Sequence, residues 1–347
     1  MKPLFIFLFF SAIGFESCQQ SSEDFKQQGI SKSKKGDYKG AIKDFNAAIK
    51  LNSQDTSLYG NRARAEFQAN EYSDAAHDFQ RIVNLCPKSL QAHFNLAMVN
   101  IHYYQPLAIE EFGKVLQMDS TNIDAYIQRS ELRRLDGNWK GCVEDLNKVI
   151  FLNPKYPNIY RRRAFAYGEL LEYKKAIDDY NKSVELYKNT MSVNGIAGIH
   201  FSLGYLKEKL NDFKGALTEY TIAAETYGDT SRDVEIGDLY HLRGLVKMEL
   251  ADFKGALKDF DKSIKISPTG ANYCDRGRVK FVLSDYKSAI SDYDSAMKNN
   301  NEFKEGLYNR GIAKLKIGDK SSACQDLGKA CKLGSEEACE KLKTSCK

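Results

Sequence analysis

A short segment recurs nine times along the chain, and this repetition constrains the fold more than any other feature. Each copy follows a turn-forming stretch, as in Gly36–Phe45 and Asp285–Tyr293, and carries a small residue at one fixed place. These small residues are Ala41, Ala75, Ala108, Cys142, Ala176, Ala216, Ala256, Ala289 and Ala323. They are separated by steps of 34, 33, 34, 34, 40, 40, 33 and 34 residues. A nearly constant period of this length predicts a protein built from stacked repeat units.

Two further positions keep the same register. Most copies have another small residue twelve positions earlier: Gly29, Ala63, Ser130, Ala164, Gly204, Gly244, Gly277 and Gly311. Most also have an aromatic residue four positions later: Phe45, Phe79, Phe112, Tyr180, Tyr220, Phe260 and Tyr293. Proline follows the second segment at Pro87, Pro154 and Pro268. The pattern predicts two helices joined by a tight turn, with small residues that let the axes approach and a ring that fills the space toward the neighbouring unit.

This pattern resembles the tetratricopeptide repeat. The resemblance implies an all-α fold, a right-handed superhelical solenoid of about nine helix-turn-helix units. We expect units one to five over residues 22–186, units six to nine over residues 187–334, and a capping helix over residues 335–347. One hairpin cannot bury its apolar face alone, so neighbouring units must stack.

Two steps of 40 residues bracket the sixth unit. The extra residues lie near Tyr187–His200 and Thr226–Tyr240. They are either longer loops or one-turn extensions of the preceding helices. Insertions of this kind often lie on a binding face, and slack at the surface explains them equally well.

Charged residues also follow the repeat. All nine copies have an acid before the aromatic position: Asp44, Asp78, Glu111, Asp145, Asp179, Glu219, Asp259, Asp292 and Asp326. Six first helices carry an arginine before the small residue: Arg62, Arg129, Arg163, Arg243, Arg276 and Arg310. We expect a ladder of arginine–carboxylate pairs that joins each unit to the next, as from Asp44 to Arg62. The alternative is a basic stripe that binds an acidic ligand.

The first 17 residues predict an export signal. Lys2 precedes an apolar run over Leu4–Phe15, which is too short to span a bilayer and suits a signal-peptide core. Cys18, with a small residue before it, resembles the lipobox of bacterial lipoproteins, whose cysteine becomes the acylated N-terminus. An ordinary signal peptide that contains a cysteine is the alternative. Residues 18–24 would form a polar tether. The resemblance implies an exported envelope protein with a lipid anchor at Cys18, and it favours the outer membrane.

Four of the eight cysteines crowd the C-terminal end: Cys324, Cys331, Cys339 and Cys346. Residues seven apart share a helix face, and Lys332–Ser335 indicates the end of one helix and the N-cap of the next. Folding two helices about this turn brings Cys331 to Cys339 and Cys324 to Cys346, so the spacing predicts two disulfides. The arrangement resembles cysteine-bridged helical repeats related to the tetratricopeptide class.

The cysteines also admit other states. Four reduced cysteines packed as small apolar residues are the alternative at the C-terminal end. Zinc is disfavoured there because the segment has no CxxC pair and no histidine. Cys142 occupies a small-residue position and is interpreted as a substitute for alanine. Cys86 and Cys274 have no assigned partner.

The net charge and the histidines mainly exclude classes of function. A net charge of +5, without a run of five like charges, disfavours nucleic-acid binding. The five histidines are scattered over different units and form no catalytic or metal-binding motif: His77, His93, His102, His200 and His241. We therefore expect no enzyme activity, no metal and no small-molecule cofactor.

The resemblance also names candidate contacts to a partner. In tetratricopeptide proteins the first helices line the concave face, where polar side chains hold partner peptides. The matching positions here are Asn61, Arg64, Asn95, Gln128, Glu131, Arg162, Asp275, Arg278 and Asn309. The three asparagines match a position that clamps peptide backbone or a terminal carboxylate in the family, although the full basic clamp of chaperone-binding members is not reproduced. Each residue could instead be plain surface.

These observations favour one function and leave two alternatives. We expect a membrane-anchored scaffold outside the cytoplasm that binds a protein or peptide on its concave face. One alternative is an assembly factor of an envelope secretion or pilus machine. The other is a protein that binds or processes peptidoglycan. The sequence does not identify the partner, the membrane face or the oligomeric state.

Overall fold

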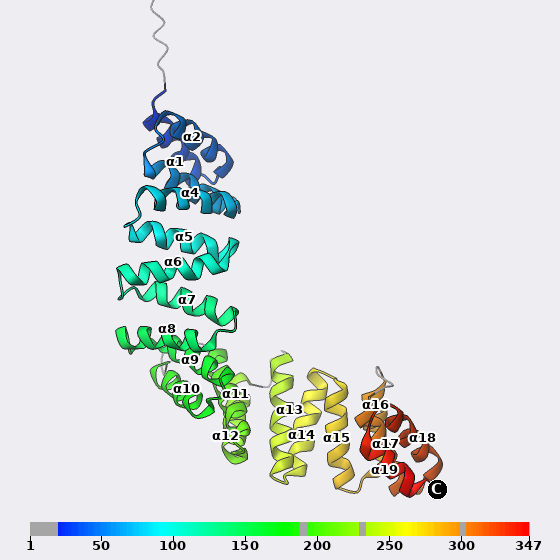
Figure 1. The fold of residues 1–347 in the computed structure, drawn as a ribbon. Helices are drawn as coiled ribbons and strands as arrows, with labels where there is room; N and C mark the ends of the chain where they lie inside the picture. Colours follow the sequence, from blue (N-terminus) through cyan, green and yellow to red (C-terminus); the bar gives the residue numbers. More distant parts are fainter. Residues whose placement is uncertain (1–19, 188–192, 229–233, 299–302, 347) are drawn as a thin grey trace, which may run out of the picture. The chain divides into compact units, whose positions relative to one another are not determined.

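The computed structural model describes residues 20–187, 193–228, 234–298 and 303–346. The expected signal peptide and Cys18 lie outside these ranges. Over the described residues the chain forms nineteen α-helices and no strand, which confirms the predicted all-α class (Figure 1). The helices divide into two compact units after Leu152, and each unit is described by itself.

Unit 1 holds the first four hairpins. Its helices are α1 (Ser22–Lys34), α2 (Tyr38–Leu51), α3 (Thr56–Gln68), α4 (Tyr72–Leu85), α5 (Leu90–Tyr103), α6 (Gln105–Met118), α7 (Ile123–Leu135) and α8 (Trp139–Leu152). Each helix packs on the next along the chain. The stacked hairpins match the units that the repeat predicts, with one pair of helices for each copy of the pattern.

Unit 2 holds five more hairpins and a final helix. Its helices are α9 (Pro157–Glu169), α10 (Tyr173–Tyr187), α11 (Val193–Lys209), α12 (Phe213–Tyr227), α13 (Val234–Glu249), α14 (Phe253–Ile266), α15 (Gly270–Val282), α16 (Tyr286–Met297), α17 (Lys304–Lys316), α18 (Lys320–Lys332) and α19 (Glu336–Ser345). The last helix packs on α18 and corresponds to the predicted capping helix.

The turn inside a hairpin depends on a left-handed residue followed by an aspartate cap. In the first hairpin Gly36 has φ +81°, and the Asp37 side chain accepts a hydrogen bond of 2.9 Å from the Gly40 amide. An added Cβ at Gly40 would crowd the Asp37 carboxylate as placed, and the same cap forms over serine at Ser288 and Ser322. The cap satisfies an amide that would otherwise have no partner at the start of the second helix.

The core of several hairpins is built from a small residue and a ring that the repeat places 16 residues apart. An added Cβ at Gly29 would lie 2.7 Å from Phe45 Cε1, so the ring would have to shift to admit a side chain. Phe45 also shares a core cluster with Ala65 of the next hairpin. The ring therefore fills the space toward the neighbouring unit, as the sequence predicts, while it rests on the glycine of its own hairpin.

The two longer steps lengthen helices that follow the insertions. First helices α11 and α13 have 17 and 16 residues, against 13 for α9 and α15. The preceding helices α10 and α12 have 15 residues, one more than α14. The preceding helices are thus longer by one residue and not by a full turn. Most of the added helix belongs to α11 and α13, which follow the insertions. Residues 188–192 and 229–233 lie outside the described ranges.

The C-terminal cysteines meet between α18 and α19. The structure joins Cys324 to Cys346 and Cys331 to Cys339, with Cα atoms 5.7 Å and 4.7 Å apart. Ser335 caps α19 through a 3.3 Å hydrogen bond from the Ala338 amide to its hydroxyl. These are the pairs that the spacing predicts; their oxidation in the protein stays a prediction.

The other described cysteines are not part of this cluster. Cys142 is buried in α8, in keeping with a residue that replaces alanine. Cys86 is exposed, and Cys274 is buried, where desolvation raises the pKa of its thiol to about 11. Cys274 is therefore a protonated thiol at neutral pH.

Candidate partner-binding surface

The six repeat arginines bind carboxylates inside their own hairpins. In α3 the Arg62 guanidinium donates to both carboxylate oxygens of Asp78 on α4, at 2.6 and 2.5 Å. The pairs are Arg62–Asp78, Arg129–Asp145, Arg163–Asp179, Arg243–Asp259, Arg276–Asp292 and Arg310–Asp326. The prediction that the ladder pairs Asp44 with Arg62 across a unit boundary is wrong. Arginine precedes the small residue and aspartate precedes the ring, so both contacts share one 16-residue register.

Some of these arginines reach the previous hairpin with their remaining nitrogen. Arg276 Nη1 lies 2.7 Å from Asp261, and Arg310 Nη1 lies 2.6 Å from Asp294. Both partners stand two positions after the expected acid. The arginine row is thus largely neutralised by carboxylates of the chain, which favours a structural ladder over a basic stripe for an acidic ligand.

Two hairpins without arginine use histidine instead. His93 Nδ1 lies 2.5 Å from Glu111, and His200 Nδ1 lies 2.7 Å from Glu219. These histidines lie 18 and 19 residues before their partners, against 16 for the arginines, and the partner is glutamate where the arginine hairpins have aspartate. Sequence reasoning missed these pairs, although the change from Asp to Glu in the same two copies was a readable signal.

A second cation binds the same carboxylate in many hairpins. It lies four residues after the arginine position, and its members include Arg133, Lys207, Lys247, Lys280 and Lys314. In α3 this place holds Glu66, which is buried and only 3.5 Å from Arg62 Nε. Burial, and next the Asp78 carboxylate, raise the pKa of Glu66 to about 8. Glu66 breaks the charge pattern of the repeat, and sequence reasoning overlooked it.

A groove opens along the first helices of unit 1. It has a volume of about 520 Å³ and is lined mainly by residues of α1, α3 and α5, with others from α2 and α4. Its apolar lining consists of Ile30, Phe45, Ala65, Phe67, Phe79, Met98 and Val99. The volume falls within the range of ligand pockets, and an apolar floor of this kind suits side chains of a partner.

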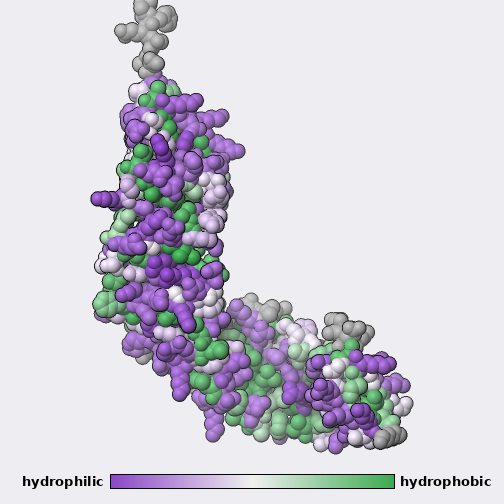
Figure 2. All heavy atoms as spheres, viewed as in Figure 1, coloured by the Kyte–Doolittle hydropathy of each residue, from purple (hydrophilic) through white to green (hydrophobic). Residues whose placement is uncertain are grey.

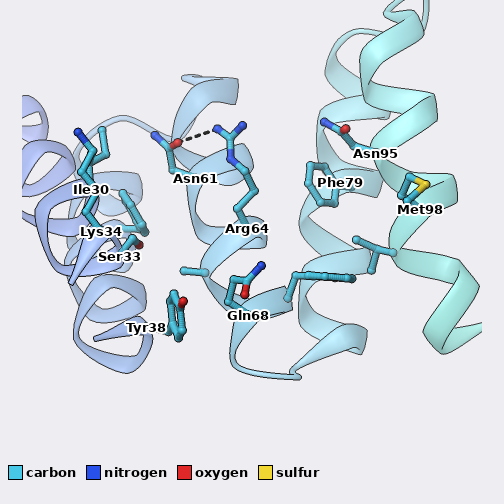
Figure 3. A pocket seen from close by; sticks show the side chains of 14 residues that line it. Ile30, Ser33, Lys34, Tyr38, Asn61, Arg64, Gln68, Phe79, Asn95 and Met98 are labelled. Atoms are coloured by element: carbon cyan, nitrogen blue, oxygen red, sulfur yellow. Dashed lines mark hydrogen bonds between the residues drawn. The ribbon is translucent and has the colours of Figure 1, made fainter. Parts of the chain in front are cut away.

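Polar residues of the groove include three of the predicted contacts. Asn61 and Arg64 come from α3 and Asn95 from α5, and Figure 3 shows them with Lys34 around the groove. Arg64 donates a 2.8 Å hydrogen bond to Asn61 Oδ1, which orients both side chains. Among the described residues that line the groove, Lys34 and Arg64 are cationic and none is anionic. The groove therefore favours a ligand with a carboxylate beside an apolar side chain.

The other six predicted contacts do not join this groove. Gln128 and Glu131 lie on α7, where Glu131 binds Arg134 at 2.6 Å. Arg162 lies on α9 in unit 2.

Three of the six lie further along unit 2. Asp275 holds both Arg278, at 3.0 Å, and His241, at 2.8 Å, so its carboxylate is engaged within the chain. Asn309 Nδ2 lies 3.6 Å from Cys274 Sγ. The structure brings together only the first three of the nine candidates.

Other kinds of site were sought among the described residues. No group of three or more His, Cys, Asp and Glu side chains in these ranges could hold a metal ion. None of the described helices is both long and apolar enough to cross a membrane. On the face that Figure 2 shows, hydrophobic residues are scattered among hydrophilic ones.

Stacked hairpins with an open groove on the first helices define a protein of the tetratricopeptide solenoid class. Comparison with known families agrees: two tetratricopeptide repeat models match residues 26–89 and 237–269. The chain therefore contains tetratricopeptide repeats, and repeats of this type generally mediate protein–protein interactions.

Relatives share the repeats over short stretches. Tetratricopeptide repeat protein 13 of Homo sapiens is 32% identical over 107 residues, which are 30% of this chain and 12% of that protein. Serine/threonine-protein phosphatase 5 of Rattus norvegicus is 26% identical over 121 residues, which are 35% of this chain and 24% of the phosphatase. This chain thus spans only a small part of these relatives, and the similarity assigns it no activity.

A solved structure supports the fold over a longer stretch. The C-terminal part of a TPR repeat-containing protein from Cytophaga hutchinsonii superposes with a TM-score of 0.59 and 19% identity. The superposition covers 70% of this chain and 95% of that one. At this level of identity the likeness concerns the fold alone.

Proposed function

We propose that the protein is a non-enzymatic scaffold that holds a segment of a partner protein in the groove of unit 1. The observation that carries this proposal is the convergence of Asn61, Arg64 and Asn95 around one apolar groove. Asparagine side chains can pair with both the amide and the carbonyl of an extended peptide, which suits recognition of backbone. The helices already hold these side chains in place, so binding needs little rearrangement.

The partner segment is defined by the lining of the groove. An aliphatic or aromatic side chain would fill the apolar floor, and a neighbouring carboxylate would meet Lys34 and Arg64. Both cations lie at exposed positions, so they contribute more to selectivity and association rate than to affinity.

The test uses a photo-crosslinking amino acid at position 68, where Gln68 lines the groove. The full chain is irradiated in cells of its host and crosslinked partners are identified by mass spectrometry. Ser33→Leu should fill the groove and abolish the adduct. Gly328→Leu, a change on α18 outside the groove where an added Cβ meets no atom within 4 Å, should leave it intact. An adduct that persists in Ser33→Leu would contradict binding in this groove.

The location of the scaffold is part of the same proposal. Its support is the N-terminal sequence, in which the apolar run and Cys18 predict export and a lipid anchor in the outer membrane. The crosslinked partner would also separate the alternatives. Recovery of secretion or pilus components would favour an assembly factor, and retention of the protein on purified sacculi would favour a role at the cell wall.

A further inference from the structure

Unit 2 has an apolar groove of its own between α9, α10 and α11. Its volume is about 300 Å³, at the lower end of the range for ligand pockets. The lining residues are Ala164, Phe165, Gly168, Glu169, Leu171, Tyr173, Tyr180, Phe201, Ser202, Tyr205 and Leu206. None of them was a predicted contact.

The groove is open because residue 168 has no side chain. The same repeat position, four residues after the small residue, carries a large side chain in most other hairpins: Phe67, Arg134, Glu208, Met248, Phe281 and Leu315. Glycine near a helix end costs up to about 1 kcal/mol relative to alanine. An added Cβ here would meet only Leu206 Cδ2, at an ordinary 3.8 Å. Packing therefore does not require this glycine, whereas a large side chain at this place would occupy the groove.

Leu171 also departs from the repeat, because it is a large residue at a position where the other hairpins have small ones. It occupies the left-handed turn position with φ +59°, which a bulky residue rarely adopts. Other hairpins place mainly glycine or small polar residues there: Gly36, Asn70, Gly137, Asn211, Ala251, Ser284 and Gly318. The Leu171 side chain is 70% exposed at the rim of the groove. Two local preferences are thus overridden at one surface, which points to a role outside folding.

The lining favours a cation. Phe165 and Tyr205 are 44% and 43% exposed, and Tyr173 and Phe201 complete the aromatic part. Glu169 is the one charged residue among the described lining residues. Aromatic faces attract ammonium and guanidinium groups, and Lys209 Nζ of this chain already lies 4.9 Å from the Tyr205 ring centroid.

We propose that the groove at Gly168 is a second peptide site, which takes an arginine or lysine side chain of a partner protein flanked by apolar residues. The aliphatic stem would lie against Phe165 and Tyr205, and the charged end would meet Glu169. This inference rests on the proposed function, partner binding through grooves on the first helices. The charge preference is opposite to that of the groove in unit 1, where Lys34 stands at the repeat position of Glu169.

The test selects a displayed random-peptide library on the purified chain from residue 19 onward, which lacks the predicted signal peptide and lipid anchor. Bound clones are then counter-screened on Gly168→Leu and on Ser33→Leu. Clones lost only on Gly168→Leu should be rich in arginine or lysine next to apolar residues. For such peptides Glu169→Gln should raise the dissociation constant roughly fivefold.

Several results would overturn the proposal. Clones that depend on Gly168 but are acidic, or have no charge preference, would show that the groove does not select a cation. Clones that depend on Ser33 alone would refute this site and leave the proposed function intact. If no clone depends on Gly168 and none depends on Ser33, both proposals are refuted. A wild-type dimer that Gly168→Leu converts to a monomer would assign the groove to a second copy of this chain.

Discussion

At the residue scale, the chemistry of each hairpin centres on one buried carboxylate before the ring. Asp78 receives two guanidinium nitrogens, and Glu111 receives a histidine and Lys114 instead. The carboxylate keeps its place through the repeat while its cation varies. A buried charge without a partner costs several kcal/mol, so acid and cation must change together. Glu66 is the exception, because it adds a second acid beside Asp78.

The first prediction concerns Glu66. Its pKa of about 8 in the folded state lies above the ordinary value of 4.5, so between these pH values the folded protein binds a proton that the unfolded chain has released. This contribution to stability is present below about pH 4.5 and is lost as pH rises to about 8. Glu66→Gln should raise the free energy of unfolding at pH 8.5 by roughly 2–4 kcal/mol, and much less at pH 4.5.

Urea denaturation of both proteins at the two pH values measures this effect, and the difference between them cancels other titrating groups. Glu66→Lys provides a second check. In α13, α15 and α17 the equivalent residue is a lysine, and it binds the repeat aspartate of the following helix. If wild type is as stable as Glu66→Gln at pH 8.5, the ionised Glu66 carboxylate does not destabilise the fold and the prediction is wrong.

The second prediction concerns Gly244. An added Cβ would lie 2.9 Å from Phe260 Cε1, and larger side chains would drive into the ring. Gly244→Leu should therefore lower the free energy of unfolding by about 2–3 kcal/mol. Gly244→Ala is the control, because better helix propensity offsets part of the crowding and Ala63 occupies this position in α3. Equal stability of the leucine variant and wild type, by urea denaturation, would refute the tight contact.

At the element scale, the hairpin is the unit that packs, and the last helix is the weakest element. α19 has ten residues, of which Ala338 is the one buried. A helix this short has little stability of its own, and so small an apolar contact adds little more. The links from Cys324 to Cys346 and from Cys331 to Cys339 attach both ends of α19 to α18.

The third prediction follows from this attachment. Alkylation of the mature protein without reductant should leave the four C-terminal cysteines unmodified by intact mass, and reduction should expose them. Reduction should also speed amide hydrogen exchange in α19 and leave α1–α4 unchanged, because those helices contain no bridge. Four alkylated C-terminal thiols in the untreated protein would disprove the disulfides.

At the scale of the whole molecule, each compact unit carries a groove on its first helices, and the linings differ in charge. Lys34 and Arg64 stand at the groove of unit 1, and Glu169 stands at that of unit 2. One chain could therefore bind two unlike segments. Linked sites of this kind raise the overall affinity when one partner presents both segments.

The fourth prediction concerns the anchor of the whole protein. Cys18→Ala should move the protein from the membrane pellet to the soluble fraction, because one acylated cysteine would supply the attachment. Cell fractionation with immunoblotting measures the change, and Cys86→Ala is the control that alters another thiol. A Cys18→Ala variant that stays in the pellet would exclude acylation as the anchor.

The sequence by itself determined the helical hairpins and their register, because these depend on contacts at a constant separation along the chain. It also placed Asn61, Arg64 and Asn95 on the first helices. The pairing of the C-terminal cysteines stays a prediction from their spacing. Tertiary structure alone decided that Arg62 pairs with Asp78 rather than Asp44, and that the grooves open at Ser33 and Gly168. Those outcomes depend on how side chains of adjacent helices fill shared space, which no single repeat position specifies.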